Sequence, residues 1–232
     1  MNLSPTTDVP GAFVDTVRDA FAGRAGDRFT LVLSGGPTAR TCYERLAEAT
    51  GIDWPAVDVY VGDERFVPAD DADANQRLIR EALLDRVGGA GSFTPMPTEP
   101  GGPDDCAAAY QEVIAGLLAG PGIDLIHLGL GTDGHTASLF PGSPPDADDD
   151  ALVRAVYSDE RAMWRITITP KVINASRTVA FAVEGVEKAA ILEAVLEGPR
   201  DPVALPSQIV APSPGRLLWL ADVAAAGTLR TT

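Results

Sequence analysis

Asp124-Leu-Ile-His-Leu-Gly-Leu-Gly-Thr-Asp-Gly-His135 joins a short apolar run to a glycine-rich polar turn. The run is nearly continuous in its apolar residues, which is typical of a strand buried on both faces of a sheet. Glycines follow at the point where this strand should end, and they allow the backbone to approach a ligand closely. The stretch therefore predicts a parallel strand that delivers polar residues to the carboxyl edge of a sheet.

The same succession of apolar runs and amphipathic segments recurs along the chain. Further strands are predicted over residues 29–33, 57–61, 178–183 and 217–220, and helices over residues 13–21, 38–49, 75–87, 104–117 and 186–196. Strands that alternate with helices form right-handed crossovers. We therefore expect an α/β fold, a doubly wound, mostly parallel sheet with helices on both faces. Two shorter segments, residues 152–157 and 165–169, are expected to pair as a small β-ribbon insertion.

Length and composition indicate one domain over residues 1–232. Hydrophobic residues make up 45% of the chain and charged residues 22%, which is enough for a sizeable core and too apolar for a disordered chain. The formal net charge of -15 repels nucleic acid and anionic membrane surfaces, so neither is an expected partner. An anionic ligand would need a local basic pocket within this field.

The cysteines and the amino terminus bear on the compartment. Cys42 and Cys106 lie far apart without CxxC spacing, so neither a disulfide framework nor a zinc site is indicated, and no other metal is expected. The first eight residues lack the basic start and apolar run of a signal peptide, and no stretch approaches the ~20 apolar residues of a membrane span. These features predict a protein of the reducing cytoplasm.

Ser34-Gly-Gly-Pro-Thr38 separates a predicted strand from a predicted helix. Gly35 and Gly36 would let the backbone approach an anion, and the free N–H groups at the start of the helix would point at it. Ser34 and Thr38 add hydroxyl donors. A tight turn with Thr38 as the N-cap of the helix explains the same residues equally well.

Gly62-Asp-Glu-Arg65 places three adjacent charges at the end of another predicted strand. The guanidinium fork of Arg65 suits a phosphate or a carboxylate, and a neighbouring carboxylate, Asp63, can take part in proton transfer. A solvated loop with a local ion pair is the plainer explanation. The position directly after a strand favours a functional role.

The two histidines of the chain have different contexts. His127 interrupts an apolar strand, where a histidine is more often a hydrogen-bonded core residue than a catalyst. His135 lies beyond the strand end, two residues from Asp133 and among glycines. An imidazole suits proton transfer near neutral pH, and a nearby carboxylate can orient it or raise its basicity. A helix-start turn rich in small residues would give the same pattern without a catalytic role.

Lys171 and Lys188 are the only lysines among 18 basic residues. Lys188 lies near the start of a predicted helix, where its charge opposes the helix dipole, and this placement suggests an anionic partner. Lys171 is explained at least as well as a surface residue.

Together these motifs resemble the 6-phosphogluconolactonases of the oxidative pentose phosphate pathway. The similarity covers nearly the whole chain and rests on Asn75 and on segments at residues 33–38, 62–65, 129–142, 165–169, 185–189 and 218–222. Gly131-Thr-Asp-Gly-His-Thr-Ala-Ser-Leu-Phe-Pro141 is the most specific of them. Related sugar-phosphate deaminases share the Asp-Gly-His core but continue with Ala-Phe-Asn-Glu. This chain has Ala-Ser-Leu-Phe there, at residues 137–140, which favours the lactonases.

The resemblance implies a sugar-phosphate isomerase-like α/β fold, a 6-phosphogluconolactone substrate and no obligatory cofactor. It implies that His135, with Asp133 nearby, acts as the general base on water, without a covalent nucleophile. The residues expected around the sugar phosphate are Ser34, Gly35, Gly36, Thr38, Arg65, Arg165 and Lys188. Backbone N–H groups near residues 129–134, or one of the arginines, would stabilise the oxyanion, and the sequence leaves this choice open.

One segment departs from the family's pattern. Members often carry a Pro-Lys-Pro-Pro-like stretch before the Arg-Ile-Thr segment, whereas this chain has Ser158-Asp-Glu-Arg-Ala-Met-Trp164 and lacks that lysine. Two other functions stay open. One is a deaminase or isomerase of the same fold, and the other is a sugar-phosphate sensor, which usually carries a basic DNA-binding segment that this chain lacks. We expect a monomer or weak homodimer that binds a phosphorylated sugar lactone.

Overall fold

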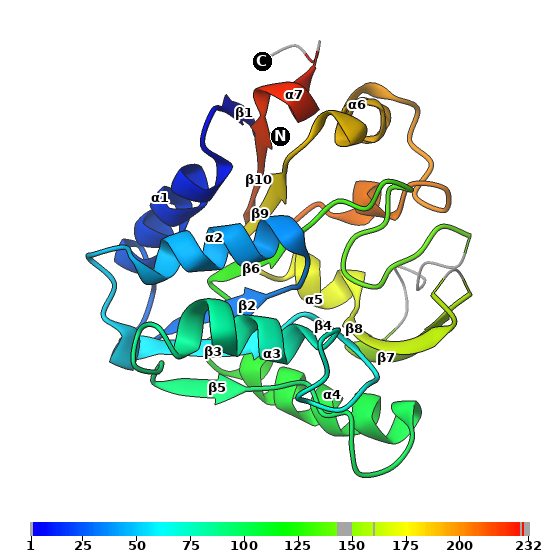
Figure 1. Ribbon diagram of the computed structural model, residues 1–232. Helices are drawn as coiled ribbons and strands as arrows, with labels where there is room; N and C mark the ends of the chain where they lie inside the picture. Colours follow the sequence, from blue (N-terminus) through cyan, green and yellow to red (C-terminus); the bar gives the residue numbers. More distant parts are fainter. Residues whose placement is uncertain (1, 143–149, 160, 228, 230–232) are drawn as a thin grey trace.

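The computed structural model describes residues 2–142, 150–159, 161–227 and 229. The strands of its main sheet are β1 (Asn2–Thr6), β2 (Phe29–Leu33), β3 (Val57–Val61), β5 (Ser92–Thr94), β6 (Leu125–Leu128), β9 (Thr178–Val183) and β10 (Arg216–Asp222). All neighbours are parallel, in the order β1-β10-β9-β6-β2-β3-β5 (Figure 1). The strands predicted over residues 29–33, 57–61 and 178–183 are confirmed with the same bounds.

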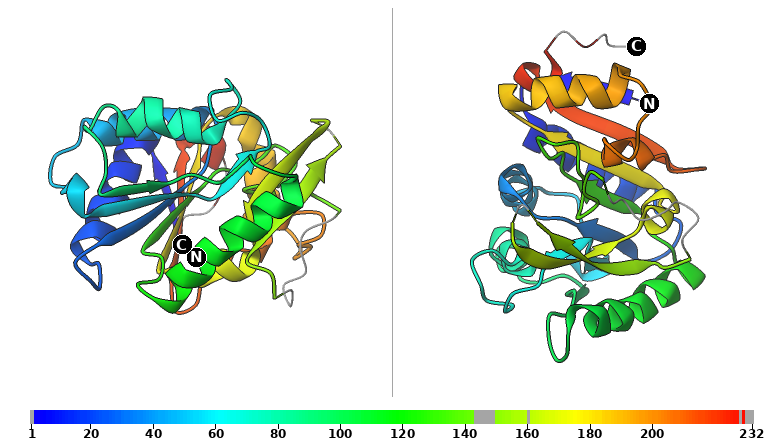
Figure 2. Two further views of the ribbon diagram at one scale, coloured as in Figure 1. Left: turned by 90° about the horizontal axis from the view of Figure 1, so that it is seen from below. Right: turned by 90° about the vertical axis from the view of Figure 1, so that its right-hand side faces the viewer.

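Helices cover both faces of this sheet. They are α1 (Val9–Ala22), α2 (Pro37–Ala47), α3 (Asn75–Ile79), α4 (Pro103–Ala119), α5 (Pro170–Asn174), α6 (Ala189–Glu197) and α7 (Val223–Ala226), with short 3-10 helices η1 (Trp54–Ala56), η3 (Val186–Lys188) and η4 (Pro206–Ile209). Because the crossovers are right-handed, helices whose connections run across the sheet toward β5 lie on one face, and helices whose connections run toward β1 lie on the other. Accordingly, α1, α2 and α3 succeed one another in Figure 1, and Figure 2 shows α4 across the sheet from α3. The doubly wound α/β fold is thus confirmed.

A second, antiparallel sheet carries the predicted ribbon. It consists of β4 (Asp63–Arg65), β8 (Met163–Ile168) and β7 (Val153–Ser158), in the order β4-β8-β7. The alternative in which residues 62–65 form a solvated loop is wrong, because Asp63 and Glu64 are buried and pair with β8. Since β4 follows β3 after Gly62, it links the two sheets and carries its side chains to the edge where β3 ends.

The core explains why the central strands are apolar without alternation. All five residues of β2 and all six of β9 are buried, since helices cover both of their faces. The buried apolar residues form one cluster that runs from α1 to α7, and within it the rings of Phe181 and Trp219 stack with centroids 3.8 Å apart. In the part of the chain that the structure describes, no helix is long and apolar enough to cross a membrane.

Besides β4, further elements differ from the sequence-based prediction, among them the unpredicted short helices α5 and α7. The short strands β1 and β5 were not predicted. They form the two edges of the main sheet, and an edge position tolerates Pro5 within β1 because one side of that strand needs no ladder hydrogen bond. The helix predicted over residues 75–87 is α3 followed by the π-helical turn η2 (Arg80–Leu84).

Candidate active site

A cavity of about 400 Å³ lies where β2, β3, β6 and β9 end. Its wall combines the turns that follow these four strands with arginines of the small sheet. The predicted site residues that border it are Ser34, Gly35, Gly36, Thr38, Asp63, Arg65, His135, Arg165 and Lys188. Asp133 does not border the cavity and contacts it through His135. The structure therefore brings together residues that are up to 154 positions apart, from Ser34 to Lys188.

His135 and Asp133 form a hydrogen-bonded pair. The imidazole Nδ1 lies 2.5 Å from Asp133 Oδ1, and the same carboxylate oxygen accepts the backbone N–H of His135 at 3.0 Å. Partial burial of Asp133 acts to raise its pKa, but these hydrogen bonds outweigh burial and lower it to about 2. An ionised Asp133 keeps the proton of His135 on Nδ1. The Nε2 lone pair is then free to accept a proton.

Glycine is required beside this pair. A Cβ atom on Gly131 would lie 2.1 Å from His135 Nδ1 and 2.6 Å from Asp133 Oδ1. Gly134 has a φ of +87°, which favours glycine, and its carbonyl oxygen accepts the Ser207 hydroxyl at 2.8 Å. The glycine-rich turn seen in the sequence thus folds tightly around the histidine and anchors it to the segment that contains η4.

Asp63 lies in the cavity wall but is not hydrogen-bonded to His135. Its Oδ2 accepts the hydroxyl of Ser138 at 2.9 Å, and its carbonyl oxygen accepts the Asn75 amide at 2.7 Å. The neighbouring Glu64 carboxylate accepts backbone N–H groups of Arg65, Asn75 and Gln76 at 2.7–2.8 Å. Burial nevertheless raises the pKa of Glu64 to about 7. These contacts fasten β4 to α3 and to the turn that carries His135.

Arg65 and Arg165 face each other across the β4–β8 pair. Like charges directly opposite on neighbouring strands are destabilising unless an anion compensates them. Arg165 is only 8% exposed; burial lowers its pKa, and the adjacent Arg65 lowers it further. The Nε atoms of both arginines are buried without a protein hydrogen-bond partner. Arg65 also donates through Nη1 to the carbonyl oxygen of Asp73. The pair therefore places two positive charges in the wall of the cavity.

The turn over residues 34–38 begins α2 without a side-chain cap. The N-cap is Gly36, with a φ of +116°, so the alternative in which Thr38 caps the helix is wrong. Thr38 lies inside the first turn, because Pro37 starts the helix. A Cβ atom on Gly35 would lie 1.7 Å from Asn75 Oδ1, so the close approach of this turn to α3 requires glycine. Uncapped N–H groups at a helix start are ready to meet an anion.

Several cavity residues were not predicted as site residues. Arg161 comes from the segment that lacks the family's lysine, and it supplies a cation on that side of the cavity. Glu184 and Glu187 lie beside Lys188, and burial raises the pKa of Glu184. His127 is buried, as predicted, and yet it borders the cavity. No group of three or more His, Cys, Asp or Glu side chains in the described ranges is arranged to hold a metal ion.

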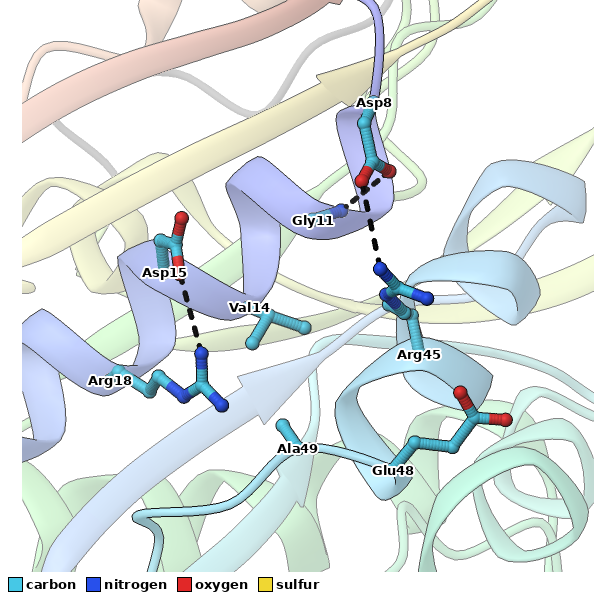
Figure 3. Close-up of a pocket in the computed structure, with 8 residues that line it drawn as sticks. All are labelled: Asp8, Gly11, Val14, Asp15, Arg18, Arg45, Glu48 and Ala49. Atoms are coloured by element: carbon cyan, nitrogen blue, oxygen red, sulfur yellow. Dashed lines mark hydrogen bonds and ion pairs between the residues drawn. The ribbon is translucent and has the colours of Figure 1, made fainter.

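A second pocket, of about 370 Å³, lies between the start of α1 and the end of α2 (Figure 3). Two ion pairs hold four of its five charged side chains: Arg45 lies 3.9 Å from Asp8, and Arg18 lies 3.5 Å from Asp15, while Glu48 adds a further negative charge. None of the residues that line it belongs to the motifs described above. The chemistry of the chain is therefore concentrated in the first cavity.

The sheet topology and the placement of this cavity define an α/β protein that holds a small ligand beyond the carboxyl ends of parallel strands. A family model described as glucosamine-6-phosphate isomerases/6-phosphogluconolactonase matches residues 6–219. The chain belongs to this family.

Individual relatives agree with the family match. A 6-phosphogluconolactonase of Synechocystis sp. is 40% identical over 207 residues, which cover 87% of this chain and 85% of the relative. The solved structure of 6-phosphogluconolactonase from Trypanosoma brucei superposes with a TM-score of 0.85 at 27% identity, and the match covers 99% of this chain and 98% of that one. A monomeric glucosamine-6-phosphate deaminase superposes with a TM-score of 0.83 at 16% identity, which is a likeness of fold alone.

Proposed function

We propose that this chain hydrolyses 6-phospho-D-glucono-1,5-lactone to 6-phosphogluconate. The relatives with substantial identity are named as lactonases, and their matches cover most of the chain. The observation that carries the proposal is the His135–Asp133 pair, which leaves Nε2 available at a cavity with several cationic side chains. Such a site suits a reaction that needs a base for water and charge for a phosphorylated ligand.

In the proposed mechanism, His135 Nε2 accepts a proton from water as the water oxygen bonds to the lactone carbonyl carbon. The imidazolium that forms is stabilised by the Asp133 carboxylate. When the tetrahedral intermediate collapses, the bond from that carbon to the ring oxygen breaks, and the imidazolium returns its proton to the leaving oxygen. A positioned base of this kind contributes about 10²–10⁴-fold to the rate. Asp63 acts on this step indirectly, through its hydrogen bond to Ser138 in the same turn.

The phosphate is assigned to the start of α2 together with Lys188 and Arg65. The uncapped N–H groups of this helix and the Ser34 hydroxyl offer hydrogen bonds, and the cations offset the repulsion from a net charge of -15. The Thr38 hydroxyl, which bonds to the Glu184 carboxylate, lies beside them. Arg165 or the backbone N–H groups of residues 129–134 stabilise the oxyanion. Binding energy from the remote phosphate then positions the reacting carbonyl. The reaction needs water and a base, and it calls for no cofactor.

The deaminase alternative is disfavoured by the segment after His135. An aminosugar deaminase must open the ring and move a proton between carbons, and the relatives of that kind place a carboxylate shortly after the Asp-Gly-His core. Residues 136–140 contain neither an acid nor a base.

Cys42 and Cys106 are buried free thiols, in keeping with our placement of the enzyme in the cytoplasm.

The test is a pair of assays on the same preparation. Freshly made 6-phosphogluconolactone should open faster with the protein than without it, after correction for spontaneous opening. Glucosamine 6-phosphate should release no ammonia even at high protein concentration. Ammonia release that disappears in His135→Ala would replace the lactonase with a deaminase, and absence of both activities with tight sugar-phosphate binding would indicate a sensor.

A further inference from the structure

One buried hydroxyl group binds the backbone of the turn that begins α2. Tyr43, in the second turn of α2, is fully buried, and its hydroxyl oxygen accepts the backbone N–H of Ser34 at 3.0 Å. The same hydroxyl lies 2.7 Å from the carbonyl oxygen of Ser34. Both polar backbone groups of Ser34 are therefore served by one side chain. Ser34 itself borders the cavity, and its own hydroxyl has no protein partner.

A buried histidine completes this arrangement. His127 is 1% exposed and lies in β6, where its Nδ1 is 2.7 Å from the Tyr43 hydroxyl and its ring centroid is 4.6 Å from that of Phe13. Burial lowers the pKa of His127 to about 3, so the imidazole is neutral near physiological pH. A neutral imidazole carries its hydrogen on only one nitrogen. Its other nitrogen, Nε2, has no protein partner.

Counting hydrogens decides which nitrogen carries the proton. The Tyr43 hydroxyl has one hydrogen and two possible acceptors, the Ser34 carbonyl oxygen and His127 Nδ1. If the hydroxyl donated to Nδ1, the Ser34 carbonyl would face an oxygen lone pair at 2.7 Å and lose its partner, which is costly for a buried group. If Nδ1 carries the hydrogen, all three contacts of the hydroxyl are satisfied. His127 then donates to Tyr43, and Tyr43 donates to Ser34.

We infer that His127 and Tyr43 are positioning residues for the anion-binding turn. Because His127 donates its Nδ1–H to the Tyr43 hydroxyl, that hydroxyl donates its own hydrogen to the Ser34 carbonyl oxygen. This bond holds the backbone of the turn, and the free N–H groups at the start of α2 follow directly from that turn. Neither side chain contacts reacting atoms. The inference rests on the proposed function only in assigning a phosphate to this turn, and inorganic phosphate tests that assignment without any turnover.

The variants separate hydrogen bonding from packing. Tyr43→Phe keeps the ring and removes the hydroxyl, and His127→Leu removes the Nδ1–H donor. His127→Asn returns an amide N–H close to the former Nδ1 position. Phe13→Leu is the matched control, since it disturbs the packing on His127 without removing a hydrogen bond. All variants are compared below their unfolding transitions, where each is folded.

We expect Tyr43→Phe and His127→Leu to weaken inorganic phosphate and 6-phosphogluconate binding about tenfold and to raise KM for the lactone similarly, with kcat little changed. His127→Asn and Phe13→Leu should bind as the parent does. Nitrogen chemical shifts of the parent, simple to assign with two histidines, should show His127 protonated at Nδ1. An Nε2–H tautomer, equal phosphate affinity in Tyr43→Phe and the parent, or equal losses in His127→Leu and His127→Asn would overturn the inference. A parent that binds phosphate as described but opens no lactone would overturn the proposed function alone.

Discussion

His127 lies in β6 and His135 lies in the turn that follows it, and the two side chains have different surroundings. The side chain of His135 is 30% exposed, bonds to an ionised Asp133 and borders the cavity. The ring of His127 contacts Phe13 and Tyr43, and burial holds its pKa at about 3, far below that of a free histidine. Burial and hydrogen-bond partners, rather than the imidazole itself, are the reason why we propose proton transfer for His135 and positioning for His127.

His135→Ala should remove lactone hydrolysis while leaving 6-phosphogluconate affinity nearly intact, because the residue acts on water and lies in a turn. We expect a loss of about 10²–10⁴-fold in kcat, and a smaller loss for Asp133→Asn, which keeps the base but loses the ionised partner. Steady-state assays with the lactone and calorimetry with the product measure the two effects. Turnover near the parental value in His135→Ala would contradict the assignment.

His127 should contribute to acid sensitivity of the fold. Its pKa is about 3 in the folded chain against 6.5 for a free histidine, so the unfolded chain binds more protons between these pH values. The free energy of unfolding should therefore fall as the pH falls from 6.5 toward 3, and His127→Asn should flatten this dependence. Urea titrations at several pH values measure it. Parallel loss of stability in the parent and the variant would show that His127 does not drive it.

Part of the site could be predicted from single residues and part could not. The spacing of Asp133 and His135 is local, so the sequence was sufficient to pair them. Arg161 and the cavity position of His127 depend on how the small sheet and α2 pack against the main sheet, and no local pattern encodes this. The π-helical turn η2 could not be predicted either, because an apolar period of 3.6 residues does not distinguish it from an α-helix.

At the scale of elements, the segments after β2, β3 and β9 each contribute charge or donors to the proposed phosphate site. Lys188→Ala and Arg65→Ala should each weaken 6-phosphogluconate binding by about 1.5–3 kcal/mol, the value for a hydrogen bond to a charged group. Lys171→Ala is the matched control, because Lys171 bonds to Asp150 at 2.8 Å and does not border the cavity. Calorimetry is the measurement. Unchanged affinity in both variants would move the phosphate elsewhere.

The central strands were predicted more accurately than the strands at the edges of the two sheets. Central strands bury both faces, so their composition alone marks them, as for β2 and β9. β1 is five residues long and contains Pro5, and it is a strand because β10 offers it a backbone ladder. β4 is charged throughout and is ordered by its pairing with β8. Both depend on partners distant in the sequence.

For the whole molecule, we propose that residues 1–232 unfold as one domain, because a single apolar cluster joins both ends of the described chain. The three tryptophans report on separate places, with Trp54 before β3, Trp164 in the small sheet and Trp219 in β10. Tryptophan fluorescence and far-ultraviolet circular dichroism should therefore give coincident urea transitions. Two separated transitions would show that the small sheet is independently stable.

We also expect a monomer or a weak homodimer in solution. Among the described residues, the exposed large hydrophobic side chains are Val113, Tyr157, Trp164, Val186, Val203 and Val223, of which Tyr157 and Trp164 pack against each other with ring centroids 5.4 Å apart. A net charge of -15 adds repulsion between copies. Sedimentation velocity at micromolar protein should give the monomer mass or a concentration-dependent average. A single dimer boundary that persists on dilution would contradict this expectation.

The close contacts at Gly35 and Gly131 determine where redesign of the substrate range can begin. At both positions backbone rather than side chain forms the wall, and an added methyl group would collide with Asn75 or His135. Enlarging or reshaping the cavity there would displace His135 or the start of α2. Phe140 and Ala137 also line the chamber. Shortening Phe140 would enlarge the cavity while both glycine contacts stay in place, but its ring packs on His135 with centroids 5.2 Å apart, so a replacement there must still support that histidine.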